Sequence, residues 1–227
     1  MDEMTVETCC GRGEELLQLG QWSEAEEAFR GALDLDQQSL AAHSGLGRSL
    51  HAQARHDEAI SVLKEGLALS PGNARFLFLI GQSYVALNEN DCALDAFTVA
   101  LAIEPDNPEY RYSRALALGV LGRKEEAVEE FLATLRLNPQ DAFAQCNLGI
   151  TYARLGSVAE AHDAFLQAIT LNPQYAYAQY ALGWTHLMTG DLDGARGQCG
   201  VVRPLDNDLA ARLEQLISEA EQPLISE

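Results

Sequence analysis

The residues of this sequence best suited to acid–base or metal chemistry are its five histidines and five cysteines. None of the histidines is spaced from another histidine or a cysteine as metal ligands on one helix face are. His162 and Asp163 are neighbours, but adjacent helical positions point apart and make no base-and-orienter pair. No phosphate-binding loop, dinucleotide-binding glycine motif or nucleophile elbow occurs. We therefore expect no metal, no cofactor, no catalytic residue and no enzymatic activity.

The cysteines are an odd set that includes the adjacent pair Cys9 and Cys10. An odd number without paired spacing is typical of a reducing compartment. An adjacent pair can bind a soft metal or form a strained disulfide. On a helix, however, the two side chains point in different directions, so we expect a structural role for both.

The charge of the chain restricts its partners. Thirty-four acidic and 15 basic residues give a net charge of −19, and 47% hydrophobic content indicates a folded core beneath that charge. Nucleic acid and anionic membranes would be repelled. The start, residues 1–4, has no apolar run behind it, and no stretch reaches the roughly 20 apolar residues of a membrane span. We expect a cytoplasmic protein whose partner is a protein or peptide, and a basic peptide remains open.

A fixed period organises the whole sequence. Four prolines recur at intervals of 34 residues, at Pro71, Pro105, Pro139 and Pro173. At the same period a small residue recurs in two columns, which are Gly13, Gly47, Gly81, Ala115, Gly149 and Gly183, and Ala25, Ala59, Ala93, Ala127, Ala161 and Ala195. Each period holds two amphipathic helical patterns, and small residues at these positions let the two helices approach closely.

The pattern resembles the tetratricopeptide repeat family. The family's order of signature residues is met by Leu148, Gly149, Tyr152, Ala161, Phe165, Ala168 and Pro173. The resemblance implies an all-α fold, a right-handed α-solenoid of six 34-residue helix-turn-helix repeats closed by a C-terminal capping helix. A coiled coil is excluded, because glycine and proline interrupt the heptads in every period.

The same resemblance sets the expected boundaries. The solenoid is expected at 6–207, with units that start near 6, 40, 74, 108, 142 and 176. A capping helix is expected at 208–222, with short tails at 1–5 and 223–227. The ending EQPLISE is similar to an epitope tag and receives no function. In the sixth unit, three glycines and Pro204 predict a short second helix that is the least stable of the twelve.

In this family the first helix of each unit lines a concave binding groove, and positions two, five, nine, twelve and thirteen of that helix are expected to face it. The groove candidates are Arg48, Arg75, Phe78, Gln82, Tyr112, Leu116, Phe143, Asn147, Ile150, Arg154, Tyr177, Tyr180 and Trp184. Some relatives grip a C-terminal carboxylate with lysine, arginine and asparagine. Asn147 matches one of those columns, but Ser44, Phe78 and Tyr112 stand where a basic residue is needed, which argues against that mode.

Two features of the groove have alternative interpretations. The aromatic cluster near the C-terminus is either a binding site or a surface that the capping helix covers, above all at Trp184 and Met188. The three arginines are either anchors for carboxylates or partners of Glu14 and Glu109 in ordinary ion pairs.

These observations predict a non-catalytic adaptor or scaffold that binds an extended or helical segment of another protein in the groove. The alternatives are a structural protein that assembles with copies of itself, and a chaperone that shields a partner segment.

Overall fold

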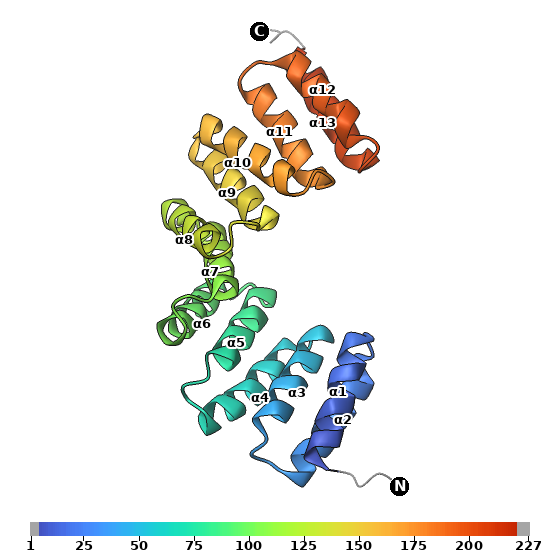
Figure 1. Ribbon diagram of the computed structural model, residues 1–227, viewed down its shortest axis with the longest axis vertical. Helices are drawn as coiled ribbons and strands as arrows, with labels where there is room; N and C mark the ends of the chain where they lie inside the picture. The colour runs from blue at the N-terminus through green and yellow to red at the C-terminus, as the bar shows by residue number, and fades with distance from the viewer. Residues whose placement is uncertain (1–4, 222–227) are drawn as a thin grey trace, which may run out of the picture. The chain divides into compact units, whose positions relative to one another are not determined.

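The computed structural model describes residues 5–221, and within that range it contains thirteen α-helices and no strand (Figure 1). The chain divides into two compact units between Leu121 and Gly122. Of the expected tails, residues 1–4 and 223–227 lie outside the described residues, as does residue 222 of the expected capping helix. No helix in 5–221 has the length and hydropathy needed to cross a membrane.

The first unit contains seven helices, in which each helix packs on the next along the chain. They are α1 (Val6–Gln18), α2 (Trp22–Leu35), α3 (Leu40–Ala52), α4 (His56–Leu69), α5 (Ala74–Ala86), α6 (Asn90–Ile103) and α7 (Pro108–Val120).

The second unit contains six helices, and here too neighbours along the chain pack on one another. They are α8 (Lys124–Leu137), α9 (Ala142–Leu155), α10 (Val158–Leu171), α11 (Ala176–Met188), α12 (Leu192–Val202) and α13 (Asn207–Glu221). The last helix also contacts α11, so it covers the end of the sixth helix pair.

Side-chain caps fix where the odd-numbered helices begin. In α1, α3, α5, α7 and α9 a side-chain oxygen of the preceding residue accepts a hydrogen bond from a backbone N–H of the first turn. The capping residues recur every 34 positions and are Thr5, Ser39, Asn73, Asn107 and Asp141. These are the residue types that best satisfy the free N–H groups of a helix start. Tyr175 breaks the series and caps α11 without a side-chain hydrogen bond.

A second series fixes the turn inside each helix pair. One residue there has a positive φ, and these residues too are 34 positions apart. They are Gly20, Ala54, Asn88, Gly122, Gly156 and Gly190. Glycine adopts this left-handed conformation freely and asparagine tolerates it, whereas alanine is strained.

Glycines of the odd-numbered helices make room for large side chains of the even-numbered ones. A Cβ on Gly81 would lie 2.4 Å from the ring of Phe97, and a Cβ on Gly149 would lie 2.6 Å from that of Phe165. Both rings are about 1% exposed. Each ring therefore fills the space that its glycine leaves, which joins the two helices of a repeat into one packed layer.

The sixth pair is closed differently. Cys199 occupies the position at which earlier repeats have phenylalanine or leucine, and α12 has 11 residues where each earlier even-numbered helix has 14. Leu213 of α13 fills the space over Gly183, where an added Cβ would lie 2.4 Å from a methyl group of Leu213. Leu213 is fully buried. The capping helix thus replaces the large side chain that the last repeat lacks.

Candidate functional site

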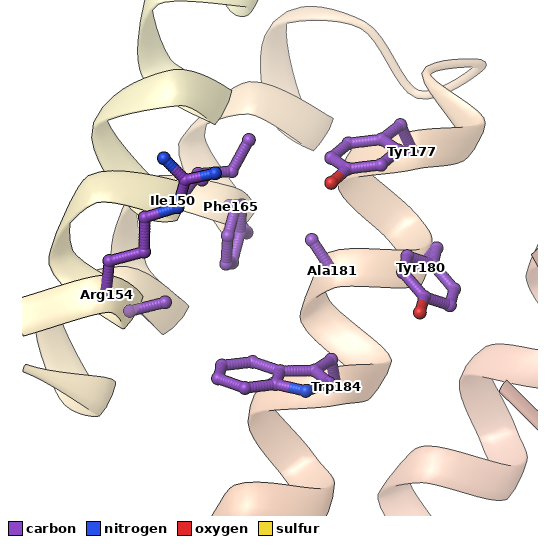
Figure 2. Close-up of a pocket in the computed structure, with 8 residues that line it drawn as sticks. Ile150, Arg154, Phe165, Tyr177, Tyr180, Ala181 and Trp184 are labelled. Carbon is purple, nitrogen blue, oxygen red and sulfur yellow. The ribbon is translucent and has the colours of Figure 1, made fainter. Parts of the chain in front are cut away.

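A pocket opens between α9 and α11 in the second unit, and its volume is about 370 Å³ (Figure 2). Its lining residues are Ile150, Ala153, Arg154, Phe165, Tyr177, Tyr180, Ala181 and Trp184. Figure 2 shows Ile150 and Arg154 on one wall, with Tyr177 and Trp184 projecting toward them from α11. The volume is at the lower end of the range, roughly 300–1,000 Å³, that ligand pockets occupy.

The walls of this pocket combine apolar surface with hydrogen-bond donors. Tyr177 is 42% exposed, and Trp184 and Ile150 are partly exposed. The side chains of Arg154, Tyr177 and Trp184 make no hydrogen bond or ion pair with any residue in 5–221. An exposed apolar surface with free donors at its edge can take an apolar side chain together with an acceptor group.

Tyr180 was expected to face the groove, but the structure shows that it is buried. It borders the pocket but is only 9% exposed, because its ring packs in a core formed by α12 and α13. The small side chains of Ala195 and Ala210 leave room for the ring there. The capping region therefore covers Tyr180, whereas Met188 is 55% exposed and Trp184 stays partly exposed.

Phe143 and Asn147 lie on α9 but do not line the pocket. Phe143 is 56% exposed, and its ring centre is 5.0 Å from that of Tyr175. The Asn147 amide donates to the backbone carbonyl of Phe143 at 3.0 Å. Cys146, on the same helix, is fully buried, and burial raises the pKa of its thiol to about 11. Cys146 is therefore a core residue.

In the first unit the remaining candidates line two cavities. One of about 210 Å³ is bordered by Arg48, Arg75 and Gln82 among others. A second of about 420 Å³ is bordered by Gln82, Tyr112 and Leu116 among others. Arg48 and Arg75 both line the smaller cavity, whereas the lining of the larger one contains no Arg, Lys, Asp or Glu.

Arg48 and Arg75, the two groove candidates among the arginines of the first unit, are each paired with a carboxylate 34 residues away. Arg48 donates to Glu14 at 2.7 Å, and Arg75 donates to Glu109 at 3.0 Å. Each pair joins equivalent positions of neighbouring repeats. Such exposed pairs contribute about 0–1 kcal/mol to stability. In each pair, however, a glutamate of the chain already binds the guanidinium group that a partner's carboxylate would need.

Phe78 is not a groove residue, contrary to the sequence-based expectation. Its side chain is 0% exposed. The ring lies 4.7 Å from that of Tyr110, centre to centre, and the guanidinium of Arg75 lies 5.1 Å above it. Phe78 is therefore covered by the next odd-numbered helix and by Arg75.

Histidine contacts that the spacing in the sequence does not reveal occur in both units. His51 and His56 meet edge to face with ring centres 4.8 Å apart, and His162 and His186 do so at 5.5 Å. Burial, and then the neighbouring His56, lower the pKa of His51. Within 5–221 no three His, Cys, Asp or Glu side chains gather as metal ligands do. The hydroxyl of Ser83 lies 3.1 Å from Nδ1 of His51, but Ser83 is fully buried and donates to the backbone carbonyl of Leu79.

The sequence interpretation missed three residues of the pocket. Ala153 and Ala181 are small residues beside large groove residues, and that pairing of sizes is the signal that could have identified them. Phe165 was assigned to the packing between helices, which is correct, and the edge of its ring also forms the floor of the pocket.

Comparison with known sequences identifies the repeat. One sequence model described as tetratricopeptide repeat matches residues 10–74 and 146–200, and a second with the same description matches residues 50–117. No curated protein matches the chain.

Comparison with solved structures shows the same architecture. The protein PilF of Pseudomonas aeruginosa superposes with a TM-score of 0.80 at 19% identity, over 92% of this chain and 96% of that one. YrrB, described as a TPR protein with an unusual peptide-binding site, gives 0.69 at 22% identity over 84% of this chain and 99% of that one. A chain of the APC/C hetero-tetramer Cut9–Hcn1 gives 0.78 at 20% identity over 96% of this chain, which spans only 43% of that protein's length.

Proposed function

Because the chain belongs to the tetratricopeptide repeat family, we propose that it is a non-catalytic adaptor that binds a segment of another protein, with its main contact in the pocket between α9 and α11. The free cysteine thiols are consistent with a location in the reducing environment of the cytoplasm. Binding in the groove of a repeat array needs no chemistry beyond shape, apolar area and a few placed polar groups.

The main support for this proposal is the exposed aromatic side chains of the pocket. Tyr177 and Trp184 project into an apolar pocket that no described segment of the chain fills. Tyrosine and tryptophan are enriched among the residues that dominate binding energy at protein interfaces. They supply large contact area with few rotatable bonds, so little entropy is lost when a partner binds.

A paired substitution tests this function. The tagged chain carrying Tyr177→Ala and Trp184→Ala is compared with the parent chain in affinity purification from its own host, with quantitative mass spectrometry. We expect proteins that co-purify with the parent to be lost from the variant. The helical circular-dichroism signal and the unfolding temperature report whether both chains are folded.

The matched control removes two exposed apolar side chains elsewhere. Leu19 is 72% exposed and Trp22 is 39% exposed, and both lie in the first repeat. The variant with Leu19→Ala and Trp22→Ala should retain the same partners. Partner capture that survives in the pocket variant, or that is lost equally in the control, contradicts the assignment.

A further inference from the structure

We infer that the pocket between α9 and α11 recognises an internal segment of a partner in which an apolar side chain is followed or preceded closely by an Asp or Glu side chain. This inference rests on the proposed function and specifies the chemistry of its partner. The charges of the residues that line the pocket are its main support.

The pocket is a local exception in a very acidic chain. The protein has 34 acidic residues and a net charge of −19, yet none of the pocket's eight lining residues is Asp or Glu. Arg154 is the charged residue of the lining. A carboxylate that approaches here meets a cation at the pocket itself, whereas a basic side chain would meet like charge.

The guanidinium group of Arg154 is free to bind a partner's carboxylate, unlike those of Arg48 and Arg75. Glu14 and Glu109 occupy Arg48 and Arg75, whereas the guanidinium of Arg154 contacts no carboxylate of residues 5–221. Arg154 is exposed and runs along α9 toward Ile150 (Figure 2). A planar guanidinium pairs with a carboxylate through two parallel hydrogen bonds.

Two other lining residues carry neutral donors. The hydroxyl of Tyr177 and the indole N–H of Trp184 border the pocket and have no partner among the described residues. Trp184 can only donate, and Tyr177 can donate as well as accept. In Figure 2 the hydroxyl of Tyr177 lies at the same end of the pocket as the guanidinium of Arg154, and this pair favours an acceptor group over a donor such as Lys.

The rest of the lining selects an apolar neighbour for that carboxylate. Ile150, Phe165, Ala153 and Ala181 form apolar surface, and the volume of about 370 Å³ far exceeds that of one water. A large aliphatic or aromatic side chain can enter, and its carboxylate neighbour can stay at the edge beside Arg154. Burial of the apolar side chain supplies affinity, and the carboxylate supplies specificity.

The donors suit a side-chain carboxylate better than a chain terminus. A terminal carboxylate is captured by fixed backbone N–H groups that converge on it. Here most lining residues lie inside α9, α10 and α11, where their backbone N–H groups are already bonded within the helix. The donors that remain are the ends of long side chains, which can follow a carboxylate on a flexible side chain.

Short synthetic peptides test this inference directly. Each peptide is acetylated and amidated and has one Trp or Leu flanked by Glu, Gln or Lys, with Ser and Gly elsewhere. Affinity for the full chain is measured by fluorescence anisotropy. We expect the Glu peptides to bind at least about fivefold more tightly than the Gln peptides, with Lys peptides weakest. The preference should shrink as salt is added.

Substitution of the arginine supplies the decisive comparison. Arg154→Gln should remove the difference between Glu and Gln peptides, and Arg154→Glu should reverse the preference toward Lys peptides. Arg136, an exposed arginine of α8 in the same unit, is the matched control. Arg136→Gln should leave the preference unchanged.

Each other result overturns the inference. Equal binding of Glu and Gln peptides, an equal effect of Arg136→Gln, or no binding of any peptide excludes recognition of an acidic apolar segment. Tighter binding of a neutral peptide with a free C-terminal carboxylate indicates capture of a terminus instead. The proposed function is judged separately: apolar peptides that bind without charge preference and are lost in the Tyr177→Ala, Trp184→Ala chain refute the inference but leave the adaptor function in place.

Discussion

Position within the helix decides the role of a single side chain in this molecule. Position five of the odd-numbered helices was expected to face the groove, but Phe78, Cys146 and Tyr180 at that position are all buried. They pack against the next helix pair or the cap. Position two, in contrast, is exposed at Arg75 and Tyr177. The part of the groove that a partner could contact is therefore narrower than the sequence predicts.

Burial also predicts which cysteine reacts. Cys92 is exposed on α6, whereas Cys146 is fully buried and has a pKa of about 11. The thiolate is the nucleophile, so a raised pKa and burial both slow the reaction. With a maleimide at neutral pH, we expect rapid labelling at Cys92 and none at Cys146 until the protein unfolds, as mapped by peptide mass spectrometry. Labelling of Cys146 in the folded protein at the rate of Cys92 would contradict its placement.

At the scale of the elements, the turn inside each helix pair contains one residue with a positive φ, and alanine adopts that conformation only with strain. Ala54 has a φ of 59°, where four of the other repeats have glycine. Ala54→Gly should raise the free energy of unfolding by up to about 1 kcal/mol, because relief of the strain exceeds the entropy cost of glycine. Thermal or denaturant unfolding measures the change.

The same substitution two residues earlier is the control. Ala52 ends α3 in helical conformation and is exposed. Ala52→Gly should lower the stability, since glycine is a poor helix former. Loss of stability at both positions would show that Ala54 is not strained.

The capping helix makes a separate prediction. Leu213→Ala should cost about 2–5 kcal/mol, because it empties the space over Gly183. Hydrogen exchange should then increase in α12 and α13 first, since α12 contains three glycines and is the shortest of the even-numbered helices. Leu216→Ala, at a half-buried position of α13, should cost less. Protection of α12 and α13 that is unchanged in the Leu213→Ala protein would contradict the role given to this side chain.

The elements were predictable from the sequence because they rest on local signals. Helix caps, glycines and prolines act within a few residues, and 34-residue copies of them define the repeat. The first helices of the six repeats, α1 to α11 by odd number, begin at Val6, Leu40, Ala74, Pro108, Ala142 and Ala176. The cap series and the turn series went unnoticed although both are visible in the sequence, since each changes residue type between repeats.

The candidate site was less predictable because it depends on contacts between helices. The sequence left open whether the groove arginines pair with Glu14 and Glu109, and the structure shows that Arg48 and Arg75 do so whereas Arg154 does not. Tyr180 and Trp184 lie one turn apart on α11, yet the first is covered by the capping region and the second is not. Such differences arise from packing between elements, which no local signal encodes.

At the scale of the whole molecule, the alternative to partner binding is assembly of the chain with copies of itself through the same exposed aromatics. A net charge of −19 opposes self-association by mutual repulsion. The pocket also offers no acidic residue to its own arginine, so a second copy would have to bring a carboxylate from another surface. The repulsion between two chains of this charge weighs against a second copy as the occupant of the pocket.

Site-specific photocrosslinking inside the native host tests the central claim most directly. A photoreactive phenylalanine analogue is placed at position 184 in the pocket or, as the control, at position 22 in the first repeat. The account predicts that another protein is crosslinked from position 184 and not from position 22. Equal crosslinking from both positions, or a crosslink from position 184 to a second copy of this chain alone, would contradict the claim that the pocket between α9 and α11 binds a partner protein.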